Sequence, residues 1–251
     1  MRWLSMALCL LLLAGCSATG GGTGKRAAAA PALSHAGQLN LSLAQNYLDI
    51  GDLETALDRA NRAVRSDPGS GDAHAMLGVI HNRIGNPDKA AAEFESALRL
   101  APQSGSILNA HAVWMCERGK HEQADAEFMQ ALQDPFYKSP MQTFYNAGKC
   151  AQNAGQLDKA EVYLRRALEL SPQEPSALMT LAEVELALGN IMEARAFVQR
   201  RDALGSDAQV LELAARIEDA ANNAEAAKRY RQRLRDEFPA TEPGREGGQQ
   251  P

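Results

Sequence analysis

The sequence predicts an all-α protein: a right-handed superhelical solenoid of about six helix-turn-helix repeats. The first observation behind this prediction is a block of 34 residues that recurs along the chain, with helically spaced apolar residues on both sides of a turn. The second is the composition, since 45% of the residues are hydrophobic but only 5% are aromatic, as expected for closely packed helix pairs. No segment alternates apolar and polar residues with a period of two, so no sheet is expected.

The turn inside each repeat is the clearest periodic feature. A residue that tolerates a left-handed backbone recurs every 33 to 36 residues, where it ends the first helix. An alanine follows five residues later, and a small residue on each first helix lets the two helices approach closely. The turn residues are Gly51, Gly85, Gly119, Gly155, Gly189 and Asn222; the alanines are Ala56, Ala90, Ala124, Ala160, Ala194 and Ala227; the small residues are Ala44, Gly78, Ala112, Gly148, Ala182 and Ala215.

This pattern resembles the tetratricopeptide repeat, in register over about residues 37 to 239. Proline or another helix breaker closes most repeats, because proline cannot continue a helix. Within a repeat domain of residues 33–239, we expect the repeats at about 37–70, 71–104, 105–140, 141–174, 175–207 and 208–239.

Residues 1–15 have the pattern of a secretory signal peptide, with one positive charge followed by an apolar run too short to span a bilayer. Small residues directly before Cys16 make the segment resemble a bacterial lipoprotein leader, with cleavage before Cys16 and acyl chains, palmitate among them, on that residue. In such leaders an aspartate after the cysteine favours the inner membrane, so Ser17 points to the outer membrane, facing the periplasm. The alternative is an ordinary signal peptide with an incidental cysteine.

Two segments flank the repeats. Residues 16–32, rich in glycine and alanine, are predicted to form a flexible tether with a reach on the order of 20 Å. Residues 240–251, rich in Gly, Gln and Pro, are predicted to be a disordered tail.

The charge argues against a nucleic-acid-binding role, because the net charge is −5 and the chain carries an export signal. One basic cluster lies in the last predicted helix. We expect it to form a solvated face that closes the solenoid, and the alternative is a binding patch. The cluster consists of Lys228, Arg229, Arg231, Arg233 and Arg235.

No motif for catalysis, metal or cofactor binding is present: neither H-E-x-x-H, C-x-x-C, G-x-S-x-G nor a P-loop occurs. We therefore predict a non-enzymatic protein without metal or cofactor, monomeric before it binds a partner. The histidines are expected to be partly buried or hydrogen-bonded rather than metal ligands. They are His35, His74, His81, His111 and His121.

From the tetratricopeptide resemblance, the first helix of each repeat lines a concave binding face. In repeat one, Leu41 and Leu48 on this face are surplus to the packing positions, which predicts a groove for an apolar or amphipathic segment. The alternative is that residues 31–36 fold over these leucines as a cap. The predicted groove residues are Gln38, Leu41, Gln45, Leu48, Val79, Asn82, Asn109 and Tyr145.

Two further features lie around repeats three and four. Cys116 and Cys150 are 34 residues apart near the ends of neighbouring first helices; in an oxidising compartment they form either a disulfide or two buried free thiols. Between the repeats, residues 134–140 carry two prolines and the aromatic residues Phe136 and Tyr137. These aromatics either fill a gap in the stack or offer a contact surface.

Several short segments of the repeats carry a more specific resemblance. They are Leu108-Asn109-Ala110, Trp114-Met115-Cys116-Glu117-Arg118-Gly119, Asp134-Pro135-Phe136-Tyr137, Asn146-Ala147-Gly148, Cys150-Ala151, Arg216-Ile217-Glu218 and Leu234-Arg235-Asp236-Glu237-Phe238-Pro239. With the leader and the tether, these segments resemble the type IV pilus biogenesis and stability proteins of the PilF/PilW family. One segment and one residue depart from the family pattern: Ala110-His111-Ala112, in place of an aromatic residue and glycine, and Lys149, in place of an apolar residue.

The resemblance implies a pilotin. Such a lipoprotein binds the pilus secretin subunit in the periplasm and promotes its outer-membrane localisation and multimerisation. The alternative is a lipoprotein adaptor that recruits cell-wall hydrolases or synthases, because leader, tether and solenoid would be the same.

Overall fold

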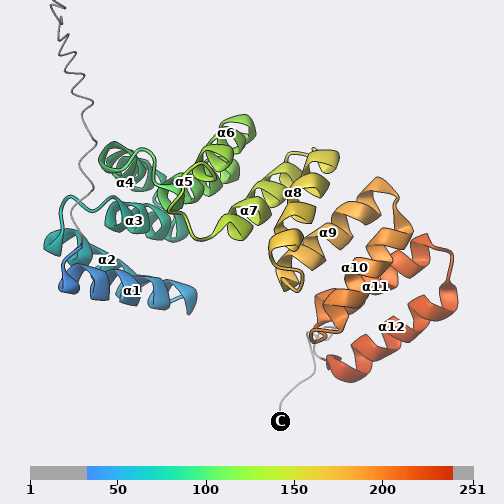
Figure 1. The fold of residues 1–251 in the computed structure, drawn as a ribbon. Coiled ribbons are helices and arrows are strands. Elements are labelled where there is room, and N and C mark those ends of the chain that lie inside the picture. The colour runs from blue at the N-terminus through green and yellow to red at the C-terminus, as the bar shows by residue number, and fades with distance from the viewer. Residues whose placement is uncertain (1–32, 240–251) are drawn as a thin grey trace, which may run out of the picture. The chain divides into compact units, whose positions relative to one another are not determined.

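The structure, a computed structural model, describes residues 33–239 (Figure 1). Over these residues the chain forms twelve α-helices and no β-strand, which confirms the predicted all-α fold. The predicted signal peptide, the predicted lipidation site Cys16, the tether and the C-terminal tail lie outside the described residues. None of the described helices is long and apolar enough to cross a membrane.

The helices form six successive helix-turn-helix pairs, and each pair packs against the next. The pairs are α1 (His35–Asp49) with α2 (Leu53–Ser66), α3 (Gly71–Ile84) with α4 (Pro87–Leu100), α5 (Gly105–Glu117) with α6 (His121–Ala131), α7 (Pro140–Asn153) with α8 (Leu157–Leu170), α9 (Pro175–Leu188) with α10 (Ile191–Asp202), and α11 (Ala208–Ala220) with α12 (Ala224–Glu237).

The turn residue of every repeat has a positive φ, as the sequence period predicts. The values run from 56° at Asn222 to 83° at Gly85. At the end of α3 the amide of Gly85 donates to the carbonyl of Asn82 at 3.0 Å, and the amide of Asn86 donates to that of His81 at 2.8 Å. The turn thus satisfies carbonyl groups that the end of a helix leaves without partners.

Small residues allow close contact between the helices of a pair. A Cβ atom on Gly78 would lie 3.0 Å from the ring of Phe94, and one on Gly148 would lie 2.7 Å from Cγ of Leu164. Phe94 and Leu164 are fully buried, so these glycines provide space for large core side chains. The recurring alanines after the turns also have no exposed surface: Ala56, Ala90, Ala124, Ala160, Ala194 and Ala227.

Two glutamates in the last repeats, Glu185 and Glu218, are buried, and the repeat pattern in the sequence does not predict their burial. The carboxylate of Glu185 in α9 accepts hydrogen bonds from Arg165 at 2.5 Å and from Asn190 at 2.8 Å. Glu218 in α11 accepts two hydrogen bonds from Arg195, at 2.7 and 2.8 Å. Each arginine lies on the second helix of the preceding repeat, so the ion pairs of these buried glutamates join neighbouring repeats.

Candidate functional site

The first helices α1, α3 and α5 lie side by side and form one face of the N-terminal repeats (Figure 1). A groove of about 590 Å³ runs along this face. Half of its lining residues are apolar, and Asp72 is the only charged residue among them. The lining consists of Leu41, Ser42, Gln45, Asn46, Asp72, Ala75, Met76, Val79, Ser106 and Ala110.

Helical periodicity explains how the groove forms. Leu41 and Gln45 are four residues apart and therefore share one face of α1, and Met76 and Val79 share one face of α3 in the same way. Asp72 accepts a hydrogen bond from the hydroxyl of Ser106 at 3.0 Å, which joins α3 to α5 at the rim. An apolar floor with a polar rim fits an apolar or amphipathic segment of another protein.

Three of the predicted groove residues line this groove: Leu41, Gln45 and Val79. The prediction for Leu48 is wrong, because this residue is only 7% exposed and does not line the groove. Leu48 belongs to the core cluster that contains Leu77 and Ile80 of α3. Leu48 is therefore covered by its neighbours, although it lies on the same face of α1 as Leu41.

The predicted alternative of an N-terminal cap concerned residues 31–36, of which 33–36 are described. None of these four residues lines the groove. Ser34 instead begins α1, where its hydroxyl accepts the amide of Gly37 at 3.0 Å and donates to Asp67 at 2.8 Å. These contacts hold the start of α1 against the end of α2.

The remaining predicted groove residues lie elsewhere. Gln38 is exposed and donates to the carbonyl of Leu33 at 3.2 Å. Asn82 donates to Glu117 at 2.6 Å, which joins α3 to α5. Asn109 accepts from Asn146 at 3.1 Å, which joins α5 to α7. These two asparagines form hydrogen bonds between neighbouring first helices.

Tyr145 lines a separate, more polar cavity of about 270 Å³. This cavity lies among α7, α9 and α11, away from the apolar groove. Of the residues that surround it, Arg201 and Asp207 are paired with each other at 2.5 Å. The lining consists of Tyr145, Lys149, Pro175, Ser176, Met179, Thr180, Glu183, Arg201, Asp207, Gln209 and Val210.

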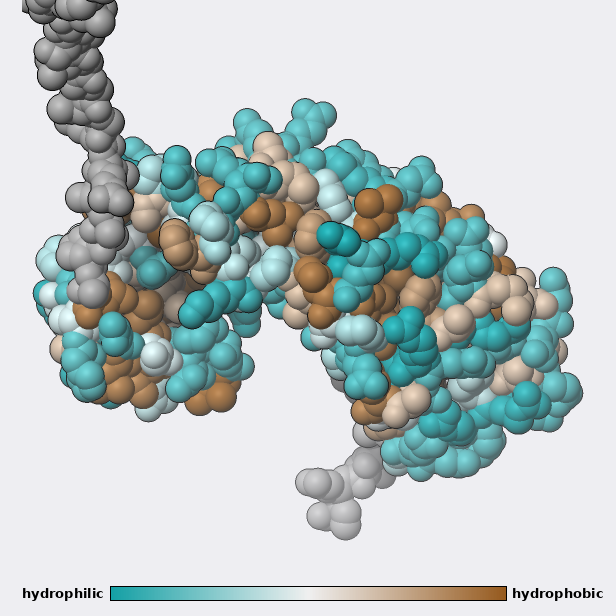
Figure 2. All heavy atoms as spheres, viewed as in Figure 1, coloured by the Kyte–Doolittle hydropathy of each residue, from teal (hydrophilic) through white to brown (hydrophobic). Residues whose placement is uncertain are grey.

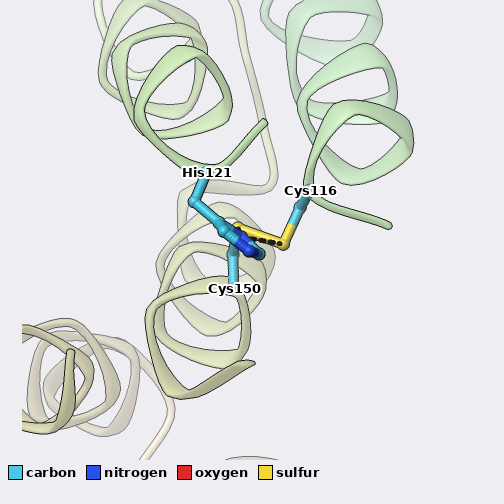
Figure 3. The surroundings of a disulfide bond; sticks show 3 residues. All are labelled: Cys116, His121 and Cys150. Carbon is cyan, nitrogen blue, oxygen red and sulfur yellow. Dashed lines mark hydrogen bonds between the residues drawn. A yellow bond between two sulfur atoms is a disulfide. The ribbon is translucent and has the colours of Figure 1, made fainter. Parts of the chain in front are cut away.

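Cys116 and Cys150 form a disulfide in the structure, with their Cα atoms 5.8 Å apart. The bond joins the end of α5 to α7 and so connects repeats three and four. His121, the first residue of α6, points toward both sulfur atoms (Figure 3). Its Nδ1 atom lies 3.7 Å from Sγ of Cys116 and 3.6 Å from Sγ of Cys150. No motif in the sequence connects this histidine with the two cysteines.

Two other histidines form hydrogen-bonded pairs with glutamates across a repeat. Nδ1 of His74 lies 2.6 Å from a carboxylate oxygen of Glu93, and Nδ1 of His111 lies 2.6 Å from one of Glu127. Burial lowers the pKa of His81, and the positive charge of Lys89 contributes to the shift. Among the described residues, the one group of three possible metal ligands is Cys116, His121 and Cys150.

The two aromatic residues between repeats three and four have different environments. The ring of Tyr137 packs against Gly105: a Cβ atom added to Gly105 would lie only 2.6 Å from Cγ of Tyr137. The hydroxyl of Tyr137 accepts a hydrogen bond from Thr143 at 2.9 Å. Burial raises the pKa of the Tyr137 hydroxyl. The side chain of Phe136 is 86% exposed. Tyr137 therefore fills the gap in the stack, whereas Phe136 faces solvent.

The visible surface over α12, the helix that carries the basic cluster, is largely hydrophilic (Figure 2). Arg231 forms an ion pair with Asp219, and Arg233 forms ion pairs with Asp202 at 2.8 Å and Glu237 at 2.9 Å. These arginines are thus compensated by acidic neighbours, as in a solvated outer face.

Comparison with known proteins identifies both the repeat and the family. Residues 41–105 and 151–217 each match a tetratricopeptide-repeat family. The crystal structure of PilW, described as a widely conserved type IV pilus biogenesis factor, is 30% identical, with a TM-score of 0.76 over 83% of this chain and 96% of that one. The chain belongs to the PilF/PilW family of type IV pilus biogenesis proteins.

A second family member agrees with this assignment. The type IV pilus assembly protein PilF of Pseudomonas aeruginosa is 25% identical over 202 residues, which cover 80% of each chain. Its solved structure superimposes with a TM-score of 0.70 over 82% of this chain and 93% of that one. Tetratricopeptide repeats mediate protein–protein interactions, and family membership therefore makes the open groove on α1, α3 and α5 the candidate interaction site.

Proposed function

We propose that this chain is an outer-membrane lipoprotein that binds the type IV pilus secretin subunit and promotes its outer-membrane localisation and multimerisation. Membership in the PilF/PilW family supports a role in pilus biogenesis. The predicted lipoprotein leader of residues 1–15, directly followed by Cys16, supports the membrane anchor. The groove lined by Leu41, Met76 and Val79 is the observation that carries the binding step.

The groove supplies the chemistry for recognising a protein segment. Leu41, Met76 and Val79 are all partly buried, so each retains some surface to cover. Burial of apolar surface contributes about 25 cal/mol per Å². The flexible Met76 side chain can adapt to the shape of the partner. Gln45 and Asn46 on the rim provide amide groups that can hydrogen-bond to the backbone of the partner.

In this mechanism no covalent chemistry is required. Acyl chains at Cys16 would determine the membrane to which the protein is attached, and the tether of residues 16–32 would let the repeats reach the secretin. The groove would hold the subunit near the outer membrane, which raises its local concentration for assembly into the multimer.

A pair of substitutions on α1 tests the binding step. Leu41 lines the groove, whereas Leu39 is 53% exposed on the same helix and does not line it. Leu41→Glu places a charge on the apolar floor, so we expect secretin recovery in co-purification from detergent-solubilised membranes to fall by about tenfold or more. Leu39→Glu should leave the recovery unchanged. Equal recovery with both variants, each with wild-type circular dichroism, would contradict the proposed groove.

A further inference from the structure

The two cysteines of the disulfide and the neighbouring His121 are residue types that bind metal ions once the disulfide is reduced. We propose that, once the Cys116–Cys150 disulfide is reduced, the two thiolates and Nδ1 of His121 bind one zinc ion. Thiolate and imidazole are the ligands that Zn²⁺ prefers in proteins. This inference is independent of the proposed role in pilus assembly.

The distances to His121 fit tetrahedral coordination. Zinc binds sulfur at about 2.3 Å and imidazole nitrogen at about 2.0–2.1 Å, so tetrahedral angles place the nitrogen roughly 3.5 Å from each sulfur. In the structure the Nδ1 atom of His121 lies 3.7 Å from Sγ of Cys116 and 3.6 Å from Sγ of Cys150. The Nδ1 atom of His121 therefore already lies at about the distance from each sulfur atom that two ligands of one zinc ion have (Figure 3).

The fold holds the three residues on separate elements. Cys116 lies in the last turn of α5, His121 begins α6 and Cys150 lies on α7. The turn between Cys116 and His121 contains Gly119, whose φ of 73° lets the chain reverse and bring the histidine back over the cysteine. The backbone of a three-ligand site is thus in place before a metal arrives.

Charge and burial also favour a divalent ion. Cys116 is 8% exposed and Cys150 is 4% exposed, so two thiolates without a counter-charge would be costly there. One Zn²⁺ ion neutralises both thiolates.

A water molecule would be the fourth ligand. The nearby carboxylate of Asp125, one helical turn after His121, is not assigned as this ligand, because it already accepts hydrogen bonds from Lys159 at 2.7 Å and from Tyr163 at 2.8 Å. A cavity of about 10 Å³ borders His121 and Cys150, which is about the space that one water molecule needs. A site with three protein ligands and a water is common for zinc.

The disulfide and the zinc site exclude each other, because both use the same two sulfur atoms. Reduction breaks the S–S bond and adds two electrons and two protons, which a dithiol supplies as it closes to its own disulfide. Zinc then displaces the protons from the two thiols. Re-oxidation of the thiols to the disulfide releases the ion. Repeats three and four are therefore joined in either redox state, once by a covalent bond and once by the metal.

The test is a metal titration of the full-length protein in both redox states. After reduction with a dithiol and removal of the reductant without oxygen, Co²⁺ should produce a thiolate-to-cobalt charge-transfer band, and one equivalent of Zn²⁺ should abolish it. The oxidised protein should show no such band. A Cys116→Ser/Cys150→Ser variant controls for other thiols in the chain and should also lack the band.

His121→Ala should weaken zinc binding by at least about tenfold in competition with a chromophoric chelator. His35→Ala, which changes an exposed histidine on α1, should leave the affinity unchanged. The proposal is overturned if the reduced wild type binds no more zinc than the double-serine variant, or if His121→Ala binds as tightly as the wild type. Loss of helical circular dichroism on reduction alone would also overturn it, because the site must be in place before the metal binds.

Discussion

Glycines at the contacts between paired helices show how single residues determine the packing of a repeat. Gly148 of α7 faces Leu164 of α8, which is fully buried. A helix-interior glycine normally costs about 1 kcal/mol relative to alanine. Here that cost is offset by the close contact, because a larger residue would push α7 away from α8.

Gly148→Ala should therefore destabilise the protein despite the higher helix propensity of alanine. The new Cβ atom would lie 2.7 Å from Cγ of Leu164, so we expect a loss of about 1–3 kcal/mol in the free energy of unfolding. Gly69→Ala is the matched control, since no atom lies within 4 Å of its added Cβ. Urea denaturation followed by circular dichroism measures both. An unchanged free energy of unfolding in Gly148→Ala would contradict this account, because α7 and α8 would then accommodate the added methyl group without cost.

The buried Glu218 should make stability depend on pH in the acid range. The hydrogen bond from Arg195 lowers the pKa of Glu218 below its ordinary value of 4.5 in the folded chain. Its stabilising contribution is therefore fully present above the unfolded pKa, and it is lost as the pH falls through the lowered, folded-state pKa.

From about pH 5 to about pH 3, the free energy of unfolding of the wild type should fall more steeply than that of Glu218→Gln. Glu212→Gln, at an exposed position on the same helix, should keep the wild-type slope. Parallel pH profiles for wild type and Glu218→Gln would contradict a difference in the pKa of this carboxyl group between the folded and unfolded states.

At the scale of helices and loops, the irregular junction between repeats three and four contains one packed and one exposed aromatic residue. Tyr137 packs beside Gly105 at the start of α5, while its neighbour Phe136 is 86% exposed. Adjacent aromatic residues in one loop thus differ in their contribution to stability. Phe136 is left free on the surface of the described domain.

Tyr137→Ala should lower the free energy of unfolding by about 1–3 kcal/mol, less than for a fully buried aromatic residue, because the side chain is partly buried. Phe136→Ala should change it by less than about 0.5 kcal/mol. Chemical denaturation of the two variants side by side measures the difference. Equal destabilisation would mean that Phe136 is also part of the packing.

The sequence was sufficient to predict the elements because their signals are local. Turn glycines, small contact residues and prolines recur with the repeat, and the helices begin and end around them. The burial of Leu48 was not predictable in this way, since it depends on Leu77 and Ile80 of the following repeat. The position of His121 beside the disulfide likewise depends on the reversal of the chain after α5 and on the approach of α7. The repeat period alone does not specify these two contacts, whereas the 34-residue spacing of Cys116 and Cys150 did indicate a possible contact between repeats three and four.

For the whole molecule, the proposed function depends on the arrangement of distinct parts along the chain. Each repeat packs mainly on its neighbours, so the groove of α1, α3 and α5 is set by the first three repeats. The later repeats extend the stack and are joined by the disulfide and by the ion pairs that the buried Glu185 and Glu218 form with Arg165 and Arg195. In the proposed mechanism, the lipid at Cys16 is as necessary as the groove.

The central claim is tested most directly by fractionating the membranes of cells that lack this protein and locating the pilus secretin. We expect secretin monomers in the inner membrane instead of heat- and detergent-resistant multimers in the outer membrane. The wild-type gene should restore the multimers, whereas Cys16→Ala and Leu41→Glu should not, and Leu39→Glu should. Normal secretin multimers in the outer membrane of the deletion strain would contradict the proposed function and would favour an adaptor for cell-wall enzymes.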